Sequence, residues 1–85
     1  MISTGRELAA EALFVSDLQP SQRPTSKCIE DAVTEMILRH GSDGCAGGVA
    51  EEFGDHPEAA VRRMSWVCGE VERVLTGNCR PHYAA

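Results

Sequence analysis

The spacing of apolar residues in the segment 26–40 constrains the fold more than any other feature of this chain. Thr25 or Ser26 can cap the start of a helix here, and Gly41 can adopt the left-handed conformation that ends one. Intervals of three and four residues place side chains on one face of an α-helix. The residues at these intervals are Ile29, Ala32, Val33, Met36, Ile37 and His40. The pattern predicts a helix over residues 26–40.

Three further segments repeat this periodicity and predict helices over residues 6–17, 44–53 and 56–76. In the last of these, Pro57 stands in the first turn, where its missing N–H costs no hydrogen bond. The third segment, 44–53, contains Gly47 and Gly48, and each glycine costs about 1 kcal/mol relative to alanine inside a helix. Either another element packs very close to these glycines, or this helix is loose.

The segment between the first two predicted helices reads QPSQRPTS, residues 19–26. Its two prolines cannot continue a helix and push the residues before them toward extended conformations. We find no strand pattern and no internal repeat. The sequence therefore predicts an all-α, compact four-helix domain over residues 1–77, followed by a flexible tail at 78–85.

Charge and hydropathy limit the partners that we expect. The formal net charge is −5, which disfavours nucleic acid and anionic membranes as partners. No apolar run reaches the roughly 18 residues of a membrane span, so we expect a cytoplasmic protein without membrane association. There the four cysteines should be reduced, and they lack the CxxC spacing of zinc or redox sites. We expect neither a metal nor a cofactor.

The stretch AEEFGDHPEAAVRRM, residues 50–64, resembles the helix-turn-helix of bacterial regulators and sigma factors. That motif places a small residue on its first helix, a glycine in its turn and a small residue on its second helix, which here are Ala50, Gly54 and Ala60. The resemblance implies a corner between the third and fourth predicted helices, with the N-terminal part of the fourth facing the DNA groove. The contacts would come from His56, Glu58, Arg62 and Arg63.

The charges around this corner oppose that interpretation. Affinity for DNA depends mainly on neutralising phosphates. Residues 51–73 hold six carboxylates and three arginines, a net charge of −3. The motif also usually has an apolar residue directly after its glycine, where this chain has Asp55. DNA binding is therefore the alternative hypothesis, and a simple helical corner is the other interpretation of the same residues.

The chain as a whole resembles short, uncharacterised cytosolic proteins of high-GC bacteria. The segments LFVSDLQPSQRPT and GCAGGVAEEFGDHPEAAVRRMSWV carry this resemblance. It implies a cytoplasmic location and no particular mechanism.

A second stripe on the fourth predicted helix lies beside its apolar row and consists of Arg62, Trp66, Gly69 and Arg73. Tryptophan and arginine are the residue types most enriched at interface hot spots. This stripe predicts a face that binds a protein partner or a second copy of the chain. The competing interpretation is that Trp66 packs against the first predicted helix.

No arrangement of residues predicts an enzyme. His40 and His56 lack a nucleophile and an orienting acid at recognisable spacing, and Cys79 with His82 is only a two-residue clip in the predicted tail. The sequence therefore favours a non-enzymatic regulatory or adaptor protein that acts through protein–protein contacts, including self-association. The alternative is a helix-turn-helix DNA-binding transcriptional regulator.

Overall fold

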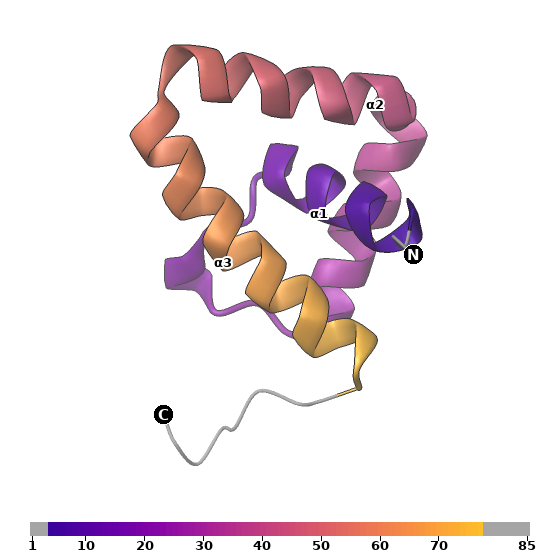
Figure 1. Ribbon diagram of the computed structural model, residues 1–85. Helices are drawn as coiled ribbons and strands as arrows, with labels where there is room; N and C mark the ends of the chain where they lie inside the picture. Colours follow the sequence, from indigo (N-terminus) through magenta and orange to yellow (C-terminus); the bar gives the residue numbers. More distant parts are fainter. Residues whose placement is uncertain (1–3, 78–85) are drawn as a thin grey trace.

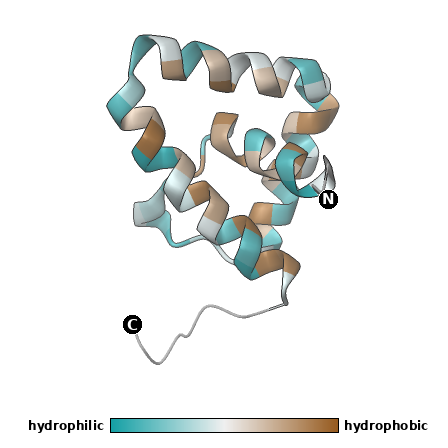
Figure 2. Cartoon of the chain, in the orientation of Figure 1, coloured by the Kyte–Doolittle hydropathy of each residue, from teal (hydrophilic) through white to brown (hydrophobic). Residues whose placement is uncertain are grey.

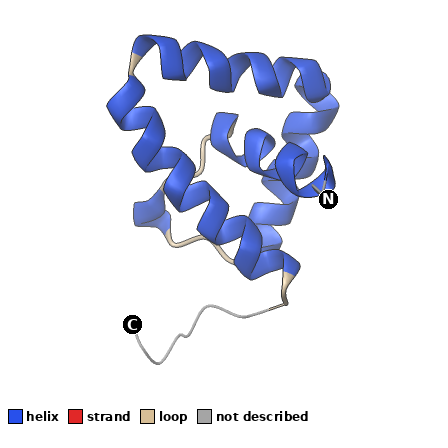
Figure 3. Cartoon of the chain, viewed as in Figure 1, coloured by secondary structure: helices blue, strands red, loops and turns tan. Residues whose placement is uncertain are grey.

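The computed structural model describes residues 4–77, which form three α-helices and one short 3₁₀ helix (Figures 1 and 3). Helix α1 spans Thr4–Val15 and helix α2 spans Ser26–Asp55. Helix α3 spans Pro57–Leu75, and the 3₁₀ helix η1, Pro20–Gln22, lies inside the linker predicted at 19–26. No strand occurs in this part of the chain. The expected all-α architecture is confirmed.

The expected number of four helices is wrong. The two helices predicted over 26–40 and 44–53 are one element, α2. We expected Gly41 to end the first of them, and its φ of 73° is indeed positive. Gly41 does break the helical geometry, as expected, but the second arm follows it without a loop, so α2 is one helix with a sharp kink.

The kink divides α2 into a first arm, residues 26–40, and a second arm, residues 42–55. Gly41 has φ 73° and ψ 172°, a combination essentially restricted to glycine. A second glycine makes room for the bend, because a Cβ atom built on Gly44 would lie 2.8 Å from the Cβ of His40. In a regular helix, residues four apart hold their Cβ atoms about 5–6 Å apart. Both glycines are therefore required by the kinked form.

Helix α1 lies inside the frame that the two arms of α2 and helix α3 form around it (Figure 1). Ala12 and Leu13 are fully buried there, and Phe14 is 4% exposed. The main apolar cluster joins Leu13 and Phe14 to buried residues of the other helices. These are Ile29 of the first arm and Ala60, Val67 and Val71 of α3. The predicted helix 6–17 ends two residues early, at Val15.

The second arm of α2 packs closely on the end of α1, which answers the question raised by its glycines. A Cβ atom built on Gly48 would lie 2.8 Å from Cγ1 of Val15, so only glycine allows this approach. Gly47, by contrast, has open space around it. Cys45 is fully buried against Ala12 and Met36, and its thiol donates a hydrogen bond to the Met36 carbonyl across the kink.

The corner between α2 and α3 differs in detail from its predicted form. We expected Gly54 to end one helix and Asp55 to cap the next. Helix α2 instead continues to Asp55, and a single residue, His56, separates it from α3. No side chain caps the N-terminus of α3, whereas Pro57 occupies the first turn as predicted. The expected cap of the first arm is confirmed at Thr25, whose hydroxyl accepts from the Cys28 amide at 3.2 Å.

Hydrophobic and hydrophilic residues alternate along the helices, as Figure 2 shows. None of the helices within residues 4–77 is both long and apolar enough to cross a membrane. The tail predicted at 78–85 lies outside the described residues.

The neighbouring glycines of the second arm provide a matched test of this packing. We expect Gly48→Ala to lower the free energy of unfolding by about 1–2 kcal/mol, because its methyl group would overlap the stiff, β-branched Val15. Gly47→Ala should instead stabilise by up to about 1 kcal/mol, the usual gain of alanine in a helix. Urea denaturation measures both. Equal effects of the two substitutions would contradict the close contact.

Candidate functional site

Arg63 of α3, expected in the alternative hypothesis to contact DNA, points inward and binds the C-terminal end of α1. Its Nε donates to the Phe14 carbonyl at 2.7 Å. Its Nη2 donates to the Leu13 carbonyl at 3.3 Å and to the Ser16 carbonyl at 3.0 Å. Three main-chain oxygens thus surround one guanidinium group.

The end of α1 needs such a partner. The last carbonyls of a helix lack intrahelical donors, and α1 has neither a basic residue in its last turn nor a glycine directly after it. The Ser16 hydroxyl donates to the Leu13 carbonyl at 2.7 Å and accepts from the Leu18 amide at 3.3 Å. Arg63 supplies the remaining donors together with a positive charge, which the negative end of the helix dipole favours.

Two aromatic rings complete the surroundings of Arg63. Its Cζ atom lies 5.6 Å from the centroid of Phe14 and 5.5 Å from that of Trp66, both within the range of cation–π contacts. Burial lowers the pKa of Arg63, and the carboxylates of Asp17 and Glu52 oppose this shift. The guanidinium remains charged, as arginine does in proteins. Arg63 therefore acts as a structural anchor between α3 and α1.

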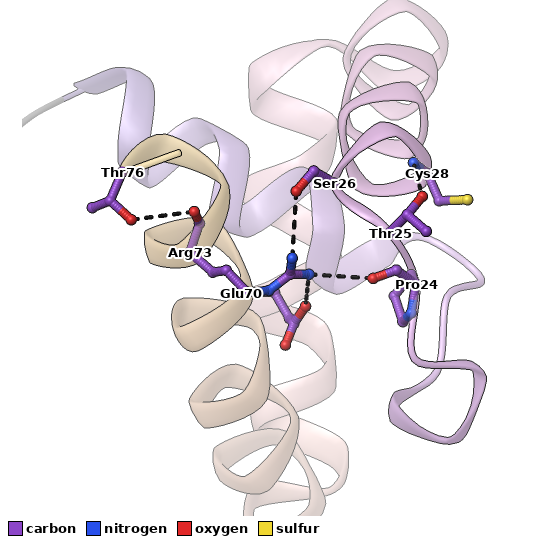
Figure 4. A network of polar contacts seen from close by, with 7 residues as sticks. All are labelled: Pro24, Thr25, Ser26, Cys28, Glu70, Arg73 and Thr76. Atoms are coloured by element: carbon purple, nitrogen blue, oxygen red, sulfur yellow. Dashed lines mark hydrogen bonds and ion pairs between the residues drawn. The ribbon is translucent and has the colours of Figure 1, made fainter. Parts of the chain in front are cut away.

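Arg73, the last residue of the predicted partner-binding stripe, is also engaged within the chain. It forms what we call the linker clamp: Arg73 donates to the Pro24 carbonyl at 3.2 Å and to the Ser26 hydroxyl at 3.3 Å, and it pairs with Glu70 (Figure 4). The Arg73 and Glu70 side chains are only 13% and 11% exposed. The clamp fastens the end of the linker, where α2 begins, to α3.

The other three residues of the stripe remain at the surface. Arg62 and Gly69 are exposed, and Trp66 is half-buried because it packs partly on the main apolar cluster. Exposed Ser65 and Val61 lie on the same side of α3 by helical spacing. We call the surface formed by Val61, Arg62, Ser65, Trp66 and Gly69 the α3 face. Val61 is 58% exposed and adds apolar area to this face.

Three of the four residues expected to contact DNA lie together at the start of α3. His56, Glu58 and Arg62 line an open hollow of about 320 Å³, with Pro57 and Ala59 between them. The Nδ1 atom of His56 lies 3.0 Å from a carboxylate oxygen of Glu52, so His56 is already paired. The fourth residue, Arg63, is directed away from this hollow.

The cysteines differ in their surroundings. Cys28 and Cys68 are exposed free thiols, whereas Cys45 is buried. Burial raises the pKa of the Cys45 thiol, and the nearby charge of Glu11 raises it further. Residues 4–77 contain no group of three or more potential metal ligands. The clip of Cys79 and His82 lies outside the described residues.

Sequence reasoning missed the role of Arg63 and the linker clamp. An apolar helix that ends without a glycine or a basic residue leaves carbonyls that require a donor, and this was the available signal for Arg63. It could not identify which arginine would serve, because Arg63 lies 47 residues from Ser16. The clamp gave no sequence signal, since Arg73 has the helical spacing of the exposed residues.

The adjacent arginines of α3 provide a matched pair of substitutions. We expect Arg63→Ala to lower the free energy of unfolding by about 2–3 kcal/mol, because it leaves three carbonyls without a charged donor. Arg62→Ala should change it by less than about 0.5 kcal/mol, as is usual for an exposed side chain. Chemical denaturation followed by circular dichroism distinguishes the two. An equally small effect of both substitutions would show that the anchor is absent in solution.

The comparisons with known proteins leave the function to be argued from the residues themselves. Neither the family models, nor the curated proteins, nor the solved structures include a match to this chain. The similarity of residues 50–64 to a helix-turn-helix and that of the whole chain to short bacterial proteins thus remain predictions from sequence.

Proposed function

We propose that this chain is a non-enzymatic regulatory or adaptor protein that binds a protein partner, or a second copy of itself, through the α3 face. The observation that carries this proposal is that half-buried Trp66 lies beside exposed Arg62 and Gly69 on one side of α3. Gly69 lies in the middle of α3 with no positive φ, and a Cβ atom built on it, as on Gly47, meets nothing within 4 Å among the described residues.

A glycine in a helix interior costs about 1 kcal/mol relative to alanine. Gly48 has an internal reason to be glycine, because α1 approaches it closely. Gly69 differs from Gly47 in lying beside Trp66 and Arg62, where a missing side chain lets the backbone of another molecule come near these two residues. The residues around Gly69 suit such a contact.

Trp66 and Arg62 are of the types that dominate interface energetics, and they lie one turn or two from Gly69. Arg63 and the main apolar cluster contact the half-buried indole of Trp66 and restrict its conformations. Little side-chain entropy would therefore be lost when Trp66 binds a partner. Val61 adds exposed apolar area at the N-terminal end of the face. A rigid aromatic flanked by an arginine and a glycine is a suitable centre for a small protein interface.

The second candidate is a helix-turn-helix-like corner that binds DNA through His56, Glu58, Arg62 and Arg63. The exposure of the first turns of α3 favours it. Three observations weigh against it: Arg63 is occupied by α1, His56 is paired with Glu52, and the carboxylate of Glu58 lines the hollow. Arg62 is then the only residue of the four left to neutralise a phosphate, which is a weak basis for DNA affinity.

Gly69→Arg tests the proposed face, and Gly47→Arg is its control. Both glycines are exposed, lie inside helices and have nothing within 4 Å of a built Cβ atom. We expect both variants to fold, as judged by circular dichroism. Partners recovered by affinity capture with the wild-type chain should be lost with Gly69→Arg and retained with Gly47→Arg, and titration of the purified partner should show at least a tenfold weaker Kd for Gly69→Arg only.

Two results would contradict the proposal. One is a partner that binds Gly69→Arg as tightly as the wild-type chain. The other is binding to mixed-sequence duplex DNA that weakens steeply with added salt and disappears in Arg62→Ala, which would favour the DNA-binding candidate.

A further inference from the structure

The kink at Gly41 divides the chain into two units, and the main apolar cluster contains residues of both. The first unit, residues 4–40, contains α1 and the first arm of α2. The second unit, residues 42–77, contains the second arm and α3. Gly41 alone joins them, and helical hydrogen bonding runs up to the kink on both sides. We infer that Gly41 is a hinge at which two copies of this chain exchange their second units.

The interface between the two units combines aromatic stacking, apolar packing and polar contacts. The rings of Phe14 and Phe53 stack with centroids 6.0 Å apart, and Cys45 packs on Ala12. The Arg63 anchor and the linker clamp also join one unit to the other. Each of these contacts can form equally well between the first unit of one copy and the second unit of another, since exchange alters only the residue that connects them.

The kink interrupts the helical geometry of α2 at a single residue. Gly41 lies outside the helical region, and a Cβ atom built on Gly44 would meet the Cβ of His40, so the kinked form depends on both glycines. If Gly41 became helical, α2 would be one straight helix of 30 residues, about 45 Å long. A short hinge between two helical arms is the type of connection at which two chains exchange elements.

A straight α2 requires a second copy. The second arm would then point away from its own α1, and buried residues such as Leu13 and Val67 would lose their cover. Exposing this core is unfavourable in water, so the open chain is stable only when the second unit of a partner copy covers it. The partner in this interaction is thus identical to the chain. The α3 face remains outward in both forms, so this inference does not depend on the proposed function.

Substitutions at Gly41 with opposite chirality separate the two forms. An L-residue is disfavoured at φ 73° and ψ 172° but favours a straight helix, so Gly41→Ala should lower the dimer dissociation constant at least about tenfold relative to the wild type. A D-residue fits the kink, because the mirror image of this conformation is an ordinary extended one. The Gly41→D-Ala chain, assembled by ligation at Cys45, should therefore be more monomeric than the wild type. Sedimentation equilibrium on the full chain measures both.

Isotope-filtered NMR on a dimer of labelled and unlabelled Gly41→Ala chains identifies the exchange. Nuclear Overhauser effects between Phe14 and Phe53 should pass between copies. Dimers in which these effects stay within one copy, or a folded Gly41→Ala chain that stays monomeric, would overturn the inference. If Gly41→Ala does not fold, Gly44→Ala provides the test, since a methyl group there also opposes the kink. A monomeric or unfolded Gly44→Ala chain would then overturn it.

Discussion

The contact between the Arg63 guanidinium and the last carbonyls of α1 is the interaction on which the rest of this structure depends. Helix α1 lies at the centre of the fold, and its last turn holds no basic residue, so only Ser16 donates locally to its final carbonyls. A buried main-chain oxygen without a partner costs about 1–3 kcal/mol, and several such groups would offset much of the stability of so small a domain. Arg63 donates to the Leu13, Phe14 and Ser16 carbonyls from another helix and so fixes α3 on α1.

This use of Arg63 also shapes the surface. Arg63 holds the indole of Trp66 from one side, which leaves Trp66 half-exposed and positioned among Arg62, Ser65 and Gly69. The linker clamp removes Arg73 from that surface in the same way. Two of the three arginines of α3, Arg63 and Arg73, thus bind within the chain, whereas Arg62 stays exposed beside Trp66 on a small face of mixed polarity.

The positions of the helices could be predicted from the sequence, but the geometry of the connections between them could not. Three-four periodicity located α1, both arms of α2 and α3 to within a few residues, because burial of one face dictates that spacing. It could not distinguish a helix end from a kink at Gly41, since a positive φ serves both. The site was less predictable. Arg62, Trp66 and Gly69 lie on one face as expected, but the inward turn of Arg63 and Arg73 depends on carbonyls 47–50 residues away.

The Nε–H group of Arg63 reports on the central contact directly. Nitrogen-detected or proton-detected NMR of the arginine side chains can compare its hydrogen exchange with that of Arg62, one residue away and exposed. Because the Arg63 Nε–H donates to the Phe14 carbonyl at 2.7 Å, it should exchange at least tenfold more slowly than the Arg62 Nε–H and show a scalar coupling to the Phe14 carbonyl carbon. Equal exchange rates for the two arginines, with no coupling, would contradict this account.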